Sequence, residues 1–298
     1  MQDKRKLGNF LLLLTAFIWG MAFASQRLAM GYVGPYTFMA CRFLLASISL
    51  GVLLYFMKGK TENLKVVDKS VIKSGVMIGL VLYCGALLQQ VGMVYTTAGK
   101  AGFITTLYII LVPILRTIFG NKIGKNVWIG VVTAFFGLSF IMLKENMSIE
   151  KGDAIVFAGS FFWAAHILFA DNFTRKHDPV MLSFIQFLTA FVLSTCMMFI
   201  LEKPSLDGIR SAFPAIFYAG VISAGVGFTL QIVAQKYTSP TVASLILCSE
   251  SGFSVLGGYI VLHEVLTKKE LIGCALMFAA IIIAQLPDKK LKINKADC

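Results

Sequence analysis

Charge is scarce in this chain of 298 residues. Only 14% of the residues are charged and 57% are hydrophobic, whereas a soluble globular domain usually has about 25% charged residues. The hydrophobic residues form long runs, and no polar stretch between them is long enough to fold as a soluble domain. The composition therefore excludes a water-soluble protein and predicts an all-α polytopic membrane protein.

Catalytic and metal-binding motifs are also missing. The chain has no nucleotide-binding glycine-rich loop with its lysine, no HExxH sequence and no GxSxG sequence. It has only three histidines, and its six cysteines show no paired spacing, so neither a metal site nor a disulfide framework is predicted. We expect a protein that is not an enzyme, with no catalytic residues, no cofactor and no metal.

The excess of positive charge is explained without nucleic acid. The net charge is +12, but the Lys and Arg residues lie in short loops between the apolar runs and at both ends of the chain. No surface module that combines basic and aromatic residues is visible. This distribution is typical of membrane topology, so we expect the lipid bilayer as a partner and no nucleic acid.

The chain contains an internal duplication. The second half repeats the first at a constant offset of 144 residues, and weaker matches at offsets of 142 and 143 follow later in each half. Tryptophan and proline in register with glycine, across two apolar runs, indicate a structural repeat. The strongest matches place Gly152, Phe161, Trp163, Pro179, Phe187, Leu188 and Ala190 on Gly8, Phe17, Trp19, Pro35, Phe43, Leu44 and Ala46.

The first apolar run imitates a cleavable signal peptide. Lys4-Arg5-Lys6 precede the run from Phe10 to Ile18, and Ala22-Phe23-Ala24 follow it. Its removal would leave the run around Trp163 without its counterpart in the repeat. We therefore interpret residues 10–30 as a retained first helix.

Apolar run lengths predict ten transmembrane helices. A bilayer core of about 30 Å needs about 20 apolar residues per helix. Pro35, Pro179 and Pro214 stand at segment starts, where a missing N–H costs little, whereas Pro113 lies inside the fourth segment and should kink it. The segments are 10–30, 36–57, 71–95, 97–119, 127–143, 154–173, 180–201, 213–235, 239–262 and 269–286.

The distribution of Lys and Arg predicts the orientation. With the N-terminus inside, 18 Lys and Arg residues lie on the cytoplasmic side and 8 on the other side, so both termini are expected in the cytoplasm of a cell-membrane protein. Five helices per repeat is an odd number, so the second repeat enters from the opposite face. We expect two inverted five-helix repeats, residues 1–147 and 148–288, followed by a basic cytoplasmic tail, residues 289–298.

Several short motifs resemble those of the EamA-type drug/metabolite transporters. The resemblance spans essentially the whole chain, with departures at Asn121, where the family has an acidic residue, and Val255, where it has a proline. It implies a central cavity lined by helices 1, 3, 4, 6, 8 and 9 of ten, and small metabolites as substrates. The motifs are Trp19-Gly20, Trp163, Pro113, Leu262-His263-Glu264, Leu266-Thr267 and Ile272-Gly273.

Glu250 is the first candidate for a substrate-binding residue. It lies near the middle of the ninth segment, and small residues share its helical face. A carboxylate there is costly, and desolvation should raise its pKa towards neutrality. Two interpretations stay open: a protonated side chain that holds helices together, or a cavity carboxylate that binds a substrate amine or a coupling proton.

Aromatic and imidazole side chains are the second group of candidates. Trp19 and Trp163 occupy equivalent repeat positions, and His166 follows Trp163 by one turn. Each could be ordinary helix packing, with His166 neutral and bonded to a carbonyl. Alternatively, the tryptophans stack on a substrate ring or cation and His166 hydrogen-bonds to the substrate.

The remaining polar residues divide between cavity and scaffold. Gln89 and Gln231 are either links between helices or cavity residues, and Tyr108 is a weaker candidate. Arg42 either snorkels or pairs, and its repeat counterpart is Gln186. Lys100 and Arg116 are interpreted as interfacial anchors, and Glu264 as a cap of the tenth helix. The expected cavity residues are thus Trp19, Gln89, Tyr108, Trp163, His166, Gln231 and Glu250.

Inverted repeats that meet at the bilayer midplane are common in secondary transporters. The leading hypothesis is therefore a secondary transporter, monomeric or homodimeric, for a small metabolite such as an amino acid, an aromatic compound or an amine. A coupling proton is a further candidate partner. Two alternatives are an integral membrane enzyme and a membrane protein that senses a ligand without transporting it.

Overall fold

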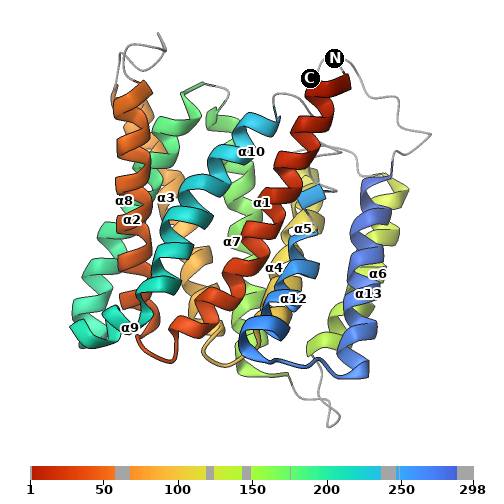
Figure 1. The fold of residues 1–298 in the computed structure, drawn as a ribbon. Coiled ribbons are helices and arrows are strands. Elements are labelled where there is room, and N and C mark those ends of the chain that lie inside the picture. Colours follow the sequence, from red (N-terminus) through yellow and green to blue (C-terminus); the bar gives the residue numbers. More distant parts are fainter. Residues whose placement is uncertain are drawn as a thin grey trace.

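The computed structural model of the protein is a bundle of helices (Figure 1). It describes residues 2–57, 68–118, 124–142, 149–174, 176–235, 246–247 and 249–286. No β-strand occurs in these ranges, so the expected all-α class is confirmed. The helices are α1 (Gln2–Ala29), α2 (Pro35–Met57), α3 (Lys69–Gly92), α4 (Ala98–Thr106), α5 (Tyr108–Ile118), α6 (Lys125–Met142), α7 (Lys151–Thr174), α8 (Pro179–Leu201), α9 (Leu206–Phe217), the π-helix η2 (Tyr218–Gly227), α10 (Phe228–Gln235), α12 (Glu250–Leu262) and α13 (Lys268–Gln285).

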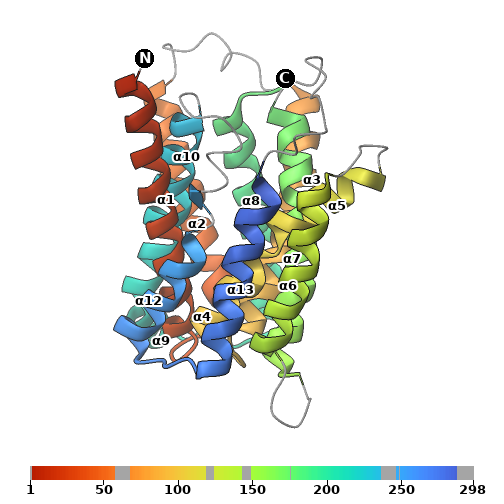
Figure 2. The same ribbon diagram turned by 90° about the vertical axis from the view of Figure 1, so that its right-hand side faces the viewer.

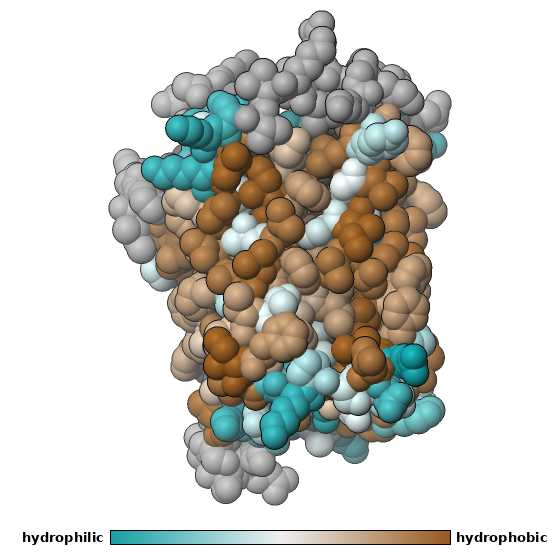
Figure 3. Space-filling model, turned by 90° about the vertical axis from the view of Figure 1, so that its left-hand side faces the viewer, coloured by the Kyte–Doolittle hydropathy of each residue, from teal (hydrophilic) through white to brown (hydrophobic). Residues whose placement is uncertain are grey.

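Within the described ranges, six helical stretches are long and apolar enough to cross a bilayer, and three shorter apolar helices accompany them. Figure 3 shows the matching surface on one face of the bundle, with hydrophobic residues across its middle and hydrophilic residues towards its two ends. The multi-pass membrane class is thus supported, while the count of ten spans stays a prediction. The six stretches are Lys6–Ala29, Pro35–Met57, Lys69–Gly92, Lys151–Ala170, Pro179–Leu201 and Leu206–Gln231.

The helices run from one end of the bundle to the other. The start of α1 and the end of α13 lie at the same end, at the top of Figure 1, which we call the terminal end; the opposite end is the far end. α1 runs from the terminal end to the far end, whereas α7 runs from the far end to the terminal end. The helices that carry Trp19 and Trp163 are therefore antiparallel.

The two halves of the chain pack through matching helices. α2 packs against α8, and α6 packs against α13 on the side of the bundle that faces the viewer in Figure 2. α3 packs against α7, and α1 against α12 and the stretch from α9 to α10. Where α2 meets α8, the repeat-equivalent residues Phe43 and Phe187 stack with ring centroids 5.9 Å apart.

Glycine allows α1 and α12 to approach closely. A Cβ atom at Gly20 would lie 2.6 Å from the carbonyl oxygen of Glu250 and would also meet the Cβ of Phe253. Neither contact can be relieved by rotating a flexible side chain, because both atoms belong to or adjoin the backbone of α12. Close backbone approach through small residues is a general way to join helices in membranes.

Two of the predicted segments are irregular. The fourth is interrupted at Leu107, between α4 and α5, and α5 then continues as a helix through Pro113. The eighth changes from α-helix to π-helix at Tyr218 and back at Phe228. A π-helical stretch alters the hydrogen-bond pattern of the backbone, and such stretches are frequent at functional sites.

The expected position of Pro214 at a helix start is wrong. Pro35 and Pro179 do open α2 and α8, but α9 starts at Leu206, capped by Ser205, so Pro214 lies inside the helix. The side chain of Ser205 accepts a hydrogen bond from the Gly208 N–H and starts the helix earlier than the apolar run does. Pro214 then removes one backbone hydrogen bond shortly before η2 begins.

The α1–α12 contact gives a test with a built-in control. We expect Gly20→Ala to lower the free energy of unfolding by about 1–3 kcal/mol, because its methyl group has no space. Gly252→Ala, at the residue directly before Phe253 in α12, adds the same methyl group where no atom lies within 4 Å. It should leave stability unchanged or slightly higher. Thermal unfolding in detergent measures both, and equal effects would contradict the packing argument.

Candidate functional site

Gln26 is the centre of a buried hydrogen-bond network between α1, α2 and α3. Its side-chain oxygen accepts a hydrogen bond from Arg42 Nη1 at 3.0 Å and another from Gln89 Nε2 at 3.3 Å. Its backbone oxygen accepts one from Gln90 Nε2 at 3.3 Å. Gln26 was not among the predicted site residues, although it follows Trp19 by two turns on the same helical face, and that spacing could have revealed it.

Trp163 extends this network to α7. Its indole N–H donates to Gln89 Oε1 at 2.9 Å, and its ring lies against Gly85 of α3. The Gln89 amide therefore donates at one end and accepts at the other, which fixes its orientation. The structure thus brings together two predicted site residues, Gln89 and Trp163, and connects them through Gln26 to Arg42.

Trp19 makes the corresponding contact in the other half. Its indole N–H donates to the backbone oxygen of Ser223 in η2 at 3.0 Å, and its ring centroid lies 5.2 Å from that of Phe228. Gly227 leaves space for the indole, since a Cβ there would lie 2.6 Å from its nitrogen. Each tryptophan therefore binds the third segment of the opposite half of the chain.

His166 is buried between α7 and α8. Its Nε2 lies 2.9 Å from the side-chain oxygen of Gln186, and its ring packs edge-on against Trp163 at 5.8 Å. This geometry assigns the proton to Nε2, with Gln186 as acceptor. Gln186 is the repeat counterpart of Arg42, so equivalent positions of α2 and α8 both carry polar side chains that point to neighbouring helices.

Glu250 forms a second interior contact, between α12 and α5. The Tyr108 hydroxyl donates to Glu250 Oε1 at 3.0 Å, and Glu250 is buried. The sequence placed Glu250 in the middle of a continuous helix, but α12 begins at this residue. The N-terminal turn of a helix favours a negative charge, which offsets part of the cost of burial. Gln231, on α10, is half-buried and belongs to neither contact.

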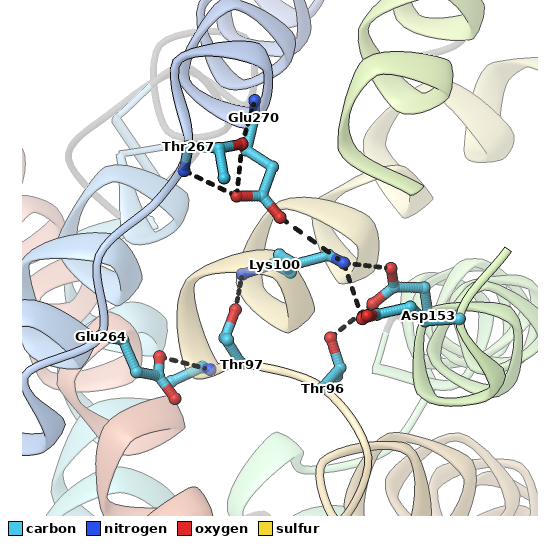
Figure 4. Close-up of polar contacts among 9 residues, drawn as sticks. Thr96, Thr97, Lys100, Asp153, Glu264, Thr267 and Glu270 are labelled. Carbon is cyan, nitrogen blue, oxygen red and sulfur yellow. Dashed lines mark hydrogen bonds and ion pairs between the residues drawn. The ribbon is translucent and has the colours of Figure 1, made fainter. Parts of the chain in front are cut away.

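Lys100 lies in an ionic cluster at the far end (Figure 4). Its ammonium group is 2.5 Å from Asp153, 3.0 Å from Glu150 and 3.7 Å from Glu270, and the Thr96 hydroxyl donates to Asp153. The interpretation of Lys100 as an interfacial anchor is wrong, because the side chain is only 6% exposed. Its three carboxylates come from α7 and α13 and the segment before α7, which the linear sequence does not show as neighbours.

Glu264 caps α4 and not the last helix, which corrects a second expectation. Its carboxylate accepts a hydrogen bond from the Ala98 N–H at 2.8 Å (Figure 4). His263 adopts a left-handed conformation with φ 55° that ends α12 and turns the chain back. Burial raises the pKa of the Glu264 carboxyl group, although nearby backbone N–H groups and Arg27 act in the opposite direction.

The start of α13 has its own cap. Thr267 and Glu270 form a reciprocal capping box, in which each side chain binds the backbone N–H of the other residue. On the opposite side of the far end, Glu202 accepts hydrogen bonds from the backbone N–H groups of Tyr36 and Thr37 at 3.0 and 2.8 Å. Carboxylates of the second half therefore cap helices of the first half.

These observations describe a helical membrane protein with aromatic and polar side chains from both halves inside the bundle. A model of the EamA-like transporter family matches residues 6–143 and, a second time, residues 150–285. The chain belongs to the EamA-like transporter family. The resemblance that the sequence motifs indicated is thereby confirmed.

Relatives of this EamA-like protein have transporter names. An uncharacterized transporter of Archaeoglobus fulgidus is 30% identical over 285 residues, which cover 95% of this chain and 87% of the relative. The uncharacterized transporter YoaV of Bacillus subtilis is 22% identical and covers 89% of this chain and 92% of its own. A crystal structure with 18% identity has a TM-score of 0.66 over 95% of this chain and 98% of that chain, which shows the same fold.

The ionic cluster around Lys100 leads to a prediction for the stability of this EamA-like protein. Lys100→Met removes the charge but keeps an unbranched side chain of similar length, and it leaves Asp153 buried without its cation. We expect a loss of about 3–5 kcal/mol in the free energy of unfolding, measured by denaturant titration in micelles. Adding Asp153→Leu should recover much of this loss. Lys268→Met, at an exposed lysine of α13, is the control, and a similar loss there would contradict the role of the cluster.

Proposed function

We propose that this protein is a secondary active transporter that exports or exchanges a small metabolite, such as an amino acid, an aromatic compound or an amine. The observation that carries the proposal is the reciprocal contact of Trp19 and Trp163 with the opposite halves. Trp19 of the first half binds η2 of the second, and Trp163 of the second half binds Gln89 of the first. Transporters built from repeats bind their substrates where the two halves meet.

Two inverted repeats are the architecture that we propose for this transport. The antiparallel course of α1 and α7 (Figure 1) and the two successive family matches support a division into residues 1–147 and 148–288. In such an architecture one half rocks against the other around a central site. Alternating access by this movement follows from the proposed symmetry.

The substrate is proposed to contact residues of both interior networks. Trp19, Trp163 and His166 offer aromatic and imidazole surfaces, and Gln89 offers an amide. Glu250 with Tyr108 offers a carboxylate and a hydroxyl group for an amine. The seventh candidate, Gln231, lies on α10 next to the segment that Trp19 contacts. The transporter names of the relatives support this function over that of a membrane enzyme.

Opening of the far end would require the contacts between the halves there to break. Lys100 with its carboxylates, Glu264 with Ala98, and Glu202 with Thr37 all join the first half to the second. The bias of Lys and Arg supports a cytoplasmic terminal end and a far end outside the cell membrane. Labelling of single cysteines at Ser70 and Lys203 from either side of the membrane tests this orientation, and outside labelling at Ser70 would contradict it.

Counterflow in proteoliposomes tests the proposed function directly. Vesicles loaded with a mixture of unlabelled amino acids and amines are diluted into a trace of each labelled compound. We expect transient accumulation of at least one labelled compound, absent from protein-free vesicles. A compound that stabilises the purified protein but never accumulates would indicate a ligand sensor instead.

The same vesicles separate the two interpretations of Glu250. Glu250→Gln is nearly isosteric and keeps the Tyr108 hydrogen bond, so the fold should be retained. If Glu250 binds a coupling proton, accumulation driven by a pH gradient is lost while counterflow continues. If it binds a substrate amine, affinity for amines falls by about 1–3 kcal/mol. Tyr108→Phe removes the hydrogen bond to Glu250 but keeps the carboxyl group, so it is the reference variant for effects on helix packing alone. Normal transport by Glu250→Gln at all pH values would leave Glu250 with a packing role only.

A further inference from the structure

Arg42 is a charged side chain inside the bundle that has no counter-ion among the described residues. It lies on α2, seven residues after Pro35 and so about two turns from the far end. Among the described residues, its buried Nε atom has no hydrogen-bond partner, and the hydrogen bond from Nη1 to Gln26 is the only one that the side chain makes. Its guanidinium carbon lies 5.1 Å from the ring centroid of Phe43 and 5.9 Å from that of Phe38.

The contrast with Lys100 shows how unusual this environment is. Lys100 has three carboxylates within 4 Å, whereas in the described part of the chain Arg42 has two aromatic rings and one amide oxygen. Rings and amide dipoles stabilise a guanidinium ion only in part. An unpaired charge inside a membrane protein is costly and typically marks a functional position.

The neighbouring Gln26 is oriented to bind an anion together with Arg42. Its side-chain oxygen accepts hydrogen bonds from both Arg42 and Gln89, which fixes the amide plane. Its Nε2 group donates no hydrogen bond to any described residue, so its two N–H donors are available beside the guanidinium. Arg42 supplies a planar array of N–H donors that matches the two oxygens of a carboxylate.

We propose that Arg42 and Gln26 bind the carboxylate group of the transported metabolite. The substrate class is therefore a small organic carboxylate, whose remaining part reaches toward Gln89 and the Trp163 ring along the same network. The repeat-equivalent position carries Gln186, bound to His166, so the anion site belongs to the first half of the chain alone. The claim that the bound carboxylate is a transported substrate rests on the proposed transport function. The claim that a carboxylate binds here rests on the geometry of Arg42.

Matched pairs of probes test the site on purified protein in phosphatidylcholine nanodiscs. Each pair shares one carbon skeleton: phenylacetate with phenylacetamide, isovalerate with isovaleramide, and L-phenylalanine with L-phenylalaninamide. Affinity is obtained from the concentration dependence of the melting temperature. We expect at least one carboxylate to bind the wild type at least tenfold more tightly than its amide.

Variants assign the preference to Arg42. Arg42→Gln should remove the preference for the carboxylate, and Arg42→Lys should retain part of it, because lysine keeps the charge but loses the planar array of donors. Arg27→Gln removes a cation from the residue next to Gln26 in α1 and should leave the preference unchanged. Gln26→Glu is the second test if Arg42→Gln fails to fold. It places a carboxylate beside Arg42 without changing the side-chain size, and it should abolish carboxylate binding while the protein stays folded.

Three outcomes would overturn the site. One is the absence of any carboxylate preference in the wild type, and another is an undiminished preference in Arg42→Gln or Gln26→Glu. The third is an Arg42-dependent stabilisation by phosphatidylglycerol nanodiscs without any effect of the soluble carboxylates, which would identify the anion as a lipid phosphate. Binding needs no sealed compartment, so binding of a carboxylate that shows no counterflow when the same carboxylate is loaded and labelled would refute the transport function and leave the anion site intact.

Discussion

A polar side chain inside a bilayer finds no water, so it needs a partner on a neighbouring helix. The interior of this protein is organised by that requirement. Trp19 and Trp163 cannot leave their indole N–H groups unpaired, and each finds an acceptor in the opposite half. Glu250 pairs with Tyr108, and His166 with Gln186. The contacts of Trp19, Trp163 and Glu250 thus also hold the two halves together, whereas the contact of His166 with Gln186 joins α7 to α8 within the second half.

Close helix packing brings these polar groups within hydrogen-bond distance of their partners. Gly20 brings α1 against α12, and Gly227 leaves the space in η2 that the Trp19 indole occupies. The far end adds charged contacts to this packing, because Lys100 and the capping carboxylates Glu202 and Glu264 each connect the first half with the second. The proposed alternating-access movement would require these contacts to be exchanged for others.

The sequence predicted much of the interior but not its connections. The repeat offset made Trp19 and Trp163 equivalent, and both do contact the opposite half. Lys100 and Glu264 were misinterpreted because each stands near a segment end, where an anchor or a local cap is the usual role. Their partners, Asp153 and Ala98, are far away in the chain. Gln26 was missed although it follows Trp19 by two turns on the same helical face, because the same spacing is also that of ordinary helix packing.

The sequence by itself determined the helical membrane class, the internal duplication and the transporter family, because these depend on composition, on the length of apolar runs and on motifs that are local. Only the tertiary structure decided that α12 begins at Glu250, that Lys100 is buried among three carboxylates, and that Arg42 has an amide and two rings as neighbours but no described counter-ion. The cost of burying a charge depends on which helices surround it. That arrangement follows from packing between segments and cannot be read from any one of them.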